Sequence, residues 1–112
     1  MTKRSSPLAL PSAPLDLLAV AVGGRQVILA WTEVGVGALG FRIERAVCNS
    51  PCSSFVEIGG VGPRVTAFRD ESVKPRMTYS YRVHAWNASG DSPPSNVVAV
   101  TTPQDDTERP AD

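Results

Sequence analysis

The stretch Thr78-Tyr-Ser-Tyr-Arg-Val-His-Ala-Trp86 alternates without a break between two sets of side chains. One set is Tyr79, Tyr81, Val83 and Ala85, and the other is Ser80, Arg82, His84 and Trp86. A period of two places such sets on opposite faces of a β-strand. The sequence therefore predicts a long strand with its Tyr/Val/Ala face in a core and its Arg/His/Trp face outward.

Shorter segments with the same alternation lie on both sides of this stretch. Each is bounded by Gly, Pro, Asn, Asp or Ser, and no stretch has a helical period. We expect six further strands at residues 15–21, 26–31, 41–47, 55–58, 64–69 and 96–101. Seven short strands with no crossover helix predict an all-β fold, a seven-stranded antiparallel immunoglobulin-like β-sandwich.

The size and composition fit one domain with two tails. The 112 residues can bury one core, and the longest apolar run, residues 17–22, is too short to insert into a membrane. Residues 1–10 are polar and interrupted by a proline, and residues 103–112 have no apolar residue larger than Ala or Pro. We therefore expect tails or linkers around a domain at residues 11–102. Eleven basic and eleven acidic residues cancel, which argues against a nucleic-acid partner.

The two cysteines bear on where the protein is found. Cys48 and Cys52 enclose three residues with turn formers and a proline, so a loop-closing disulfide is expected, with two free thiols as the alternative. A disulfide favours an extracellular or cell-surface location. The chain begins with a basic segment, but Pro7, Pro11 and Pro14 interrupt the apolar part of a signal peptide. A signal was removed, lies elsewhere or never existed.

Several features in order along the chain resemble a fibronectin type III domain, of the type found as a module in bacterial proteins. They include Pro11 and Pro14, the run Val-Ile-Leu-Ala-Trp31, Gly40-Phe-Arg-Ile-Glu-Arg45, Val73-Lys-Pro-Arg-Met-Thr-Tyr79, Asn87, Gly90 and Ser95-Asn-Val-Val. The resemblance implies two structural residues. Trp31 is expected at the centre of the core, and Tyr79 is expected to form a tyrosine corner, its hydroxyl bonded to the backbone near residues 73–75.

Two surfaces are candidates for binding. Arg42, Arg82, His84 and Trp86 are expected on the outer face of a three-stranded sheet, where Trp86 could stack on a sugar ring or a partner protein. The alternative is that arginine stems merely cover the indole. In the glycine-rich loop 32–40, the side chains of Val34, Val36 and Leu39 either fold back over the end of the core or are exposed. This loop should lie at the same end of the sandwich as loop 87–95.

We find no constellation of residues for catalysis, metal binding or a cofactor. His84 is the only histidine, and a lone imidazole without a nucleophile and an orienting acid is better explained as a surface residue than as a base. Two thiolates cannot complete a zinc site. Asn87-Ala88-Ser89 matches the glycosylation pattern, although an Asn at this corner is also a turn former.

These observations predict a non-catalytic spacer or a protein- or carbohydrate-binding module of a larger exported or surface protein. The resemblance alone suggests an accessory domain of a bacterial polysaccharide-acting enzyme. Nine Arg against two Lys are a compositional hint of a GC-rich genome. The alternative is an adhesion or receptor-type domain that uses loops 32–40 and 87–95. The expected partners are the adjacent domains of the parent protein and a protein or glycan ligand, and the module itself is expected to be a monomer.

Overall fold

The computed structural model describes residues 9–105 and contains strands but no helix in that range. The strands are β1 (Leu15–Ala21), β2 (Val27–Thr32), β3 (Gly40–Cys48), β4 (Val56–Val61), β5 (Ala67–Asp70), β6 (Thr78–Asn87), β7 (Gly90–Asp91) and β8 (Val98–Thr101). The expected all-β sandwich is confirmed. Of the expected tails, residues 1–8 and 106–112 lie outside the described residues.

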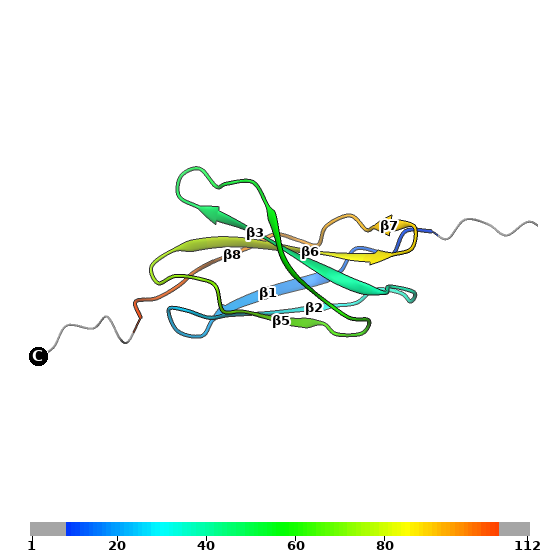
Figure 1. Ribbon diagram of the computed structural model, residues 1–112, viewed down its shortest axis with the longest axis horizontal. Coiled ribbons are helices and arrows are strands. Elements are labelled where there is room, and N and C mark those ends of the chain that lie inside the picture. Colours follow the sequence, from blue (N-terminus) through cyan, green and yellow to red (C-terminus); the bar gives the residue numbers. More distant parts are fainter. Residues whose placement is uncertain (1–8, 106–112) are drawn as a thin grey trace, which may run out of the picture.

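The strands form two antiparallel sheets that pack face to face (Figure 1). The three-stranded sheet has the order β1-β2-β5, and the five-stranded sheet has the order β4-β3-β6-β7, with β8 also paired to β6. The longest ladder joins β3 to β6, from Gly40 opposite Trp86 to Cys48 opposite Thr78. This ladder places Arg42 opposite His84 and Glu44 opposite Arg82 on one outward face.

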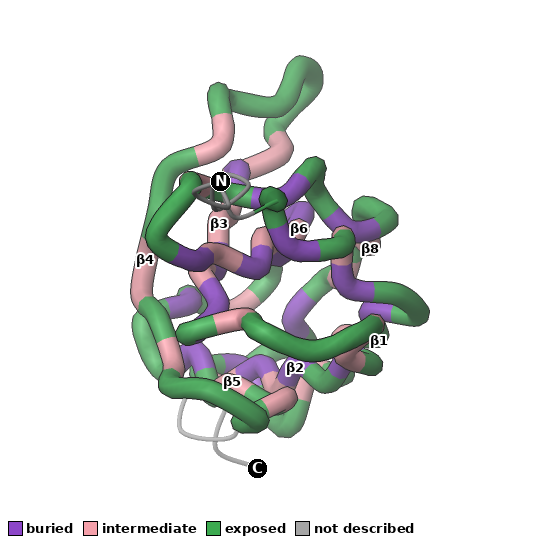
Figure 2. The backbone as a smooth tube through the Cα atoms, turned by 90° about the vertical axis from the view of Figure 1, so that its right-hand side faces the viewer, coloured by how far each residue is buried: buried purple, intermediate pink, exposed green. Residues whose placement is uncertain are grey.

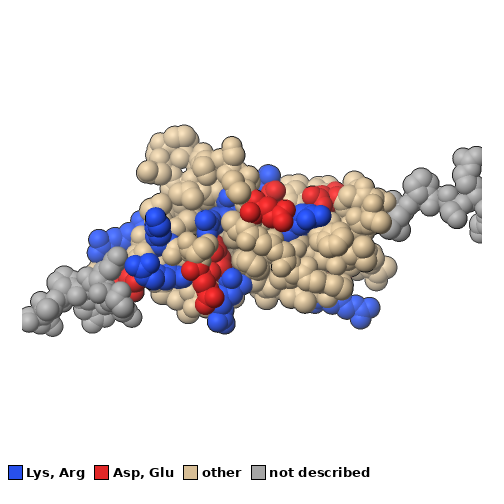
Figure 3. All heavy atoms as spheres, viewed as in Figure 1, with Lys and Arg blue, Asp and Glu red and all other residues tan. Residues whose placement is uncertain are grey.

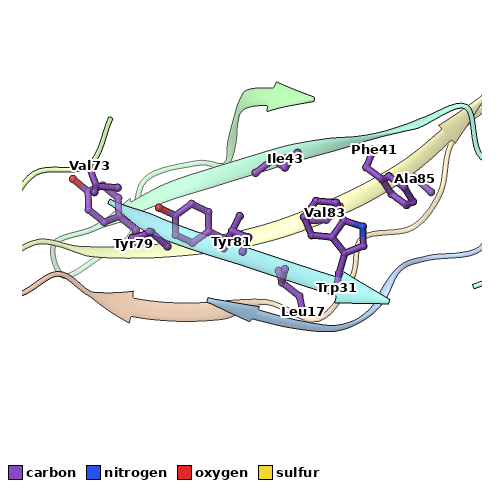
Figure 4. Close-up of a cluster of buried hydrophobic side chains, with 11 residues drawn as sticks. Leu17, Trp31, Phe41, Ile43, Val73, Tyr79, Tyr81, Val83 and Ala85 are labelled. Atoms are coloured by element: carbon purple, nitrogen blue, oxygen red, sulfur yellow. The ribbon is translucent and has the colours of Figure 1, made fainter. Parts of the chain in front are cut away.

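The core between the sheets contains the residues that the alternation predicts (Figures 2 and 4). Strand β2 contributes three side chains, and β6 contributes its entire inward set: Val27, Leu29 and Trp31 from β2, with Tyr79, Tyr81, Val83 and Ala85 from β6. The Trp31 ring packs edge-on against Phe41, 5.5 Å between centroids. Its Nε1 has no hydrogen-bond partner among the described residues, so Trp31 contributes by apolar burial and by its aromatic contact with Phe41.

The Tyr79 side chain links β6 to the segment that precedes it. Its hydroxyl accepts a hydrogen bond of 2.8 Å from the backbone N–H of Lys74, and the residue is 3% exposed. This is the geometry of a tyrosine corner at the place that the resemblance implies. The guanidinium of Arg45 lies over the ring, 5.0 Å from its centroid.

A buried carboxylate connects the two sheets. Asp70, at the end of β5, accepts bonds from Arg45 Nη1 at 2.8 Å and from the Tyr81 hydroxyl at 2.7 Å, both from the opposite sheet. Its other oxygen accepts bonds from the N–H and the hydroxyl of Ser72. Burial alone would raise the pKa of Asp70, but these hydrogen bonds outweigh it and hold the pKa below its ordinary value.

A side-chain amide closes the opposite edge of the sandwich. Asn96 Oδ1 accepts from the N–H of Leu17 at 2.9 Å, and Asn96 Nδ2 donates to the carbonyl of Leu17 at 3.1 Å. One amide thus satisfies both backbone groups at the β1 edge, where no ladder continues. It ties β1 to the segment that leads into β8.

Three sequence predictions need correction. Strand β4 continues through Gly59-Gly60 to Val61 instead of ending at residue 58, because the missing side chain of Gly59 leaves room for the Phe68 ring: a Cβ there would lie 2.7 Å from Phe68 Cζ. A two-residue strand, β7, was not predicted. The outward residues of β3 and β6 belong to the five-stranded sheet, not to a three-stranded one.

The described chain enters and leaves at opposite ends of the sandwich (Figure 1). At one end, Asn87 Nδ2 donates to the carbonyl of Ala9 at 2.8 Å. At the other end, Arg25 in the β1–β2 turn pairs with Asp105, which is 9% exposed. We call the first the loop end, because the β2–β3 and β4–β5 connections and the β6–β7 turn meet there.

Candidate recognition surfaces

Trp86 lies on the outer face of the five-stranded sheet and is partly covered. The guanidinium of Arg42 stands 5.1 Å from the centre of its ring, and the indole edge packs so close to Gly40 that a Cβ there would lie 2.7 Å from Trp86 Nε1. Asp91 on β7 accepts a bond from Arg42 Nε at 3.0 Å and holds the guanidinium in place. The contacts match the alternative in which arginine covers the indole.

Glu44 organises the middle of the same face. One carboxylate oxygen lies 2.6 Å from Arg82 Nε and 3.0 Å from His84 Nε2, while His84 Nδ1 lies 2.8 Å from the carbonyl oxygen of Ser92. Burial alone would raise the pKa of Glu44, but the hydrogen bonds from Arg82 and His84 outweigh it and lower the pKa. Both ring nitrogens of His84 are thus engaged in structural contacts.

The opposite charges on this face are interspersed. Arg82 also stacks on Phe55, 4.2 Å from the ring centroid, and Arg42 approaches Glu57 as well as Asp91. Figure 3 shows acidic and basic side chains side by side in the view of Figure 1. Such a face consists of paired charges and has no large area of one sign.

The β2–β3 loop forms the most exposed apolar feature at the loop end. Val36 at its tip is 94% exposed and Leu39 is 49% exposed, whereas Val34 is half-buried and Ala38 packs against the core. Gly35 and Gly37 have φ values of 76° and 97°, a region that favours glycine. The loop therefore does both things that the sequence left open: Val34 is half-buried, whereas Val36 and Leu39 are exposed.

A depression of about 560 Å³ lies beside this tip. It is lined by Glu33, Gly35, Val36, Gly37, Ala38, Pro63 and Arg64. One wall of the depression is the β2–β3 loop, and the other is the β4–β5 connection, which the sequence did not indicate. Loop 87–95 does lie at the same end, since the N–H of Leu39 donates to the Trp86 carbonyl at 2.8 Å, but it does not line the depression.

The two cysteines are joined. The Sγ atoms of Cys48 and Cys52 are bonded, and the short loop that they close projects from the end of β3 (Figure 1). The expected disulfide is confirmed. Ser53 folds this loop back onto the sheet, since its hydroxyl accepts from the N–H of Val47 at 2.9 Å.

Asn87 is held in a structural role. The residue is 7% exposed, its Oδ1 accepts from the N–H of Ser89 at 2.8 Å, and its Nδ2 donates to the carbonyl of Ala9. The amide nitrogen that a glycan would need is therefore already used, which favours the turn interpretation of the Asn-Ala-Ser pattern.

Within residues 9–105, no three His, Cys, Asp or Glu side chains come together so as to hold a metal ion. The same part of the chain has no helix of the length and apolarity needed to cross a bilayer.

Comparison with known sequences finds a similar segment in a much longer curated protein. No protein-family model matches the chain. Receptor-type tyrosine-protein phosphatase F of mouse is 31% identical over 97 residues, which are 84% of this chain and 5% of the relative; the human protein matches over the same share. The chain thus spans about 5% of the length of the curated relatives that it matches.

Solved structures show the same fold. The fn3 domain of human contactin 1 has a TM-score of 0.79 at 19% identity, over 98% of this chain and 93% of that one. The FN5 domain of Drosophila Lar has a TM-score of 0.67 at 21% identity, over 83% and 97%. The class is therefore an immunoglobulin-like β-sandwich. Within that class, the chain has the fibronectin type III fold, which confirms the resemblance at the level of the fold.

Proposed function

We propose that the chain is a non-catalytic linking module of a larger extracellular or cell-surface protein, with the loop end as its recognition surface. The observation that carries the proposal is the position of the described chain ends. Ala9 lies at the loop end and Asp105 at the opposite end, so modules joined to them would follow in series. The disulfide between Cys48 and Cys52 supports an oxidising location.

The loop end supports recognition of a protein ligand. It offers an apolar tip at Val36 next to a depression flanked by one acidic and one basic residue, Glu33 and Arg64. A glycan ligand would depend on stacking against Trp86, and Arg42 occupies that position. The absence of catalysis is supported by His84, whose two ring nitrogens already face Ser92 and Glu44. The bacterial polysaccharide association stays a prediction from the sequence.

The experiment is a binding screen of the purified chain against arrays of extracellular protein domains and of glycans. Three proteins are compared: the wild type, a variant with residues 34–39 replaced by Gly and Ser, and Trp86→Ala. We expect a saturable protein ligand whose binding the loop replacement abolishes and Trp86→Ala preserves. Binding that survives the loop replacement, or that requires Trp86, would reject the loop end. A screen without any ligand would reject recognition at the loop end and leave only the linking role.

A further inference from the structure

The two sheets present different outer faces to solvent. The five-stranded sheet shows paired charges, whereas the three-stranded sheet shows aliphatic side chains. Leu18 lies opposite Ala30 and Val20 opposite Ile28, and Ala30 in turn lies opposite Ala67 of β5. We call the set Leu18, Val20, Ile28, Ala30 and Ala67 the outer apolar face.

This face breaks the rule that the other sheet obeys. A sheet with one buried side and one solvated side normally alternates apolar inward with polar outward. Leu18 and Val20 are nevertheless 64% and 58% exposed, and Val22, just beyond β1, is 50% exposed. Their inward neighbours are also apolar, so β1 is aliphatic on both sides. A contiguous exposed apolar patch on a small domain marks an interaction site.

The charges around the face suggest what covers it. No charged residue occurs between Leu17 and Gly24. The face is bordered by Asp16 at the start of β1 and by Arg69 of β5, which lies opposite Ile28 of β2. These two residues stand at diagonally opposite corners, both are exposed, and neither has an ion-pair partner among residues 9–105.

We propose that the outer apolar face binds a second copy of this chain. Asp16 and Arg69 mark the two ends of one diagonal of the face. A two-fold axis that lies in the plane of the interface, along the second diagonal, brings Asp16 of each copy against Arg69 of its partner. The strands of the two copies then cross at a large angle, as in orthogonal sheet packing. The formal net charge of zero adds no long-range repulsion between copies.

The association is weak, because only five apolar side chains form its centre, whereas a standard interface uses about 20–30 residues a side. We expect a dissociation constant of about 0.1 mM. The monomer that the sequence predicts is then the species at low concentration, and the dimer forms where copies are crowded together.

The experiment is sedimentation equilibrium of the whole 112-residue chain over a concentration series that spans this value. Val20→Glu should weaken dimerisation at least tenfold. Val56→Glu is the matched control: it is the same substitution at a valine of similar exposure, 62%, on β4 of the other sheet, and it should leave the association unchanged. Circular dichroism confirms that both variants are folded.

A charge exchange tests the orientation of the two copies. Asp16→Arg and Arg69→Asp should each weaken the dimer several-fold, because each places like charges together, and the double variant should restore it. A chain that stays monomeric at the highest concentration, or equal losses from Val20→Glu and Val56→Glu, overturns the proposal. So does a monomer that co-sediments with phosphatidylcholine vesicles through the same face, since lipid would then be the occupant.

Discussion

Replacing Asp70 by Asn tests the connection between the two sheets. The substitution preserves shape but removes the charge and turns one acceptor into a donor. Whichever way the amide is oriented, an NH2 group faces donors: either Ser72 on one side, or Arg45 and Tyr81 on the other. Because Asp70 is 3% exposed, water cannot take over the lost acceptor.

The magnitude follows from the contacts that are lost. A hydrogen bond to a charged group contributes about 1.5–3 kcal/mol, and a buried donor left unsatisfied costs about 1–3 kcal/mol. The Arg45 side chain is 18% exposed, so little of its lost interaction is recovered from solvent. We expect Asp70→Asn to lower the free energy of unfolding by about 3–4 kcal/mol at pH 7. Tyr81→Phe, which removes one donor, should lower it by about 1.5 kcal/mol.

The assay is urea denaturation of the wild type and of Asp70→Asn at several pH values. The pKa of Asp70 is lower in the folded than in the unfolded protein, so the stabilisation is complete above the unfolded value of about 3.9 and is lost as the pH falls through the folded one. The difference between the two proteins should therefore shrink below about pH 4. A loss under about 1 kcal/mol at pH 7, or a difference that does not shrink in acid, would refute this reasoning.

Three further predictions concern packing, the tyrosine corner and the disulfide. Gly59→Ala should cost about 1–3 kcal/mol because its Cβ meets the Phe68 ring, whereas Gly62→Ala, with open space around it, should be nearly neutral; equal melting temperatures would contradict this. Tyr79→Phe should cost about 1 kcal/mol in urea titrations. Cys52→Ser should cost about 2 kcal/mol for so short a loop, and reduction of the wild type should add the mass of two hydrogens; no mass change would disprove the bridge.

Most of the fold follows from local patterns. The alternation in β6 and in the run that ends at Trp31 predicts which side of each strand is buried, because a strand of a sandwich has one buried side. The errors lie where long-range contacts decide. Strand β4 runs through two glycines because Phe68, from another strand, lies under Gly59. The residues next to Gly59 in the sequence do not predict this contact. The pairing of Gly90-Asp91 with the end of β6 likewise depends on a turn.

The candidate surfaces could be predicted only in part. Alternation places Arg42, His84 and Trp86 on one face, but it cannot show that Arg42 lies over Trp86 or that Glu44 joins two cations. The depression at the loop end needs Arg64 from a connection far away in the sequence. The apolar run of residues 17–22 is consistent with the outer apolar face, but a continuous apolar run is equally typical of a strand buried on both sides.

The position of the chain ends has a mechanical consequence. A pull on the two ends of the described chain acts along the long axis of the sandwich, and so along the strands (Figure 1). Antiparallel hydrogen bonds lie across that direction, so the rungs between β1 and β2 share the load in shear. The paired bonds of Asn96 with Leu17 lie on the same load path. We therefore expect the module to resist extension as a cooperative unit, and Asn96→Ala should lower the unfolding force measured in single-molecule pulling.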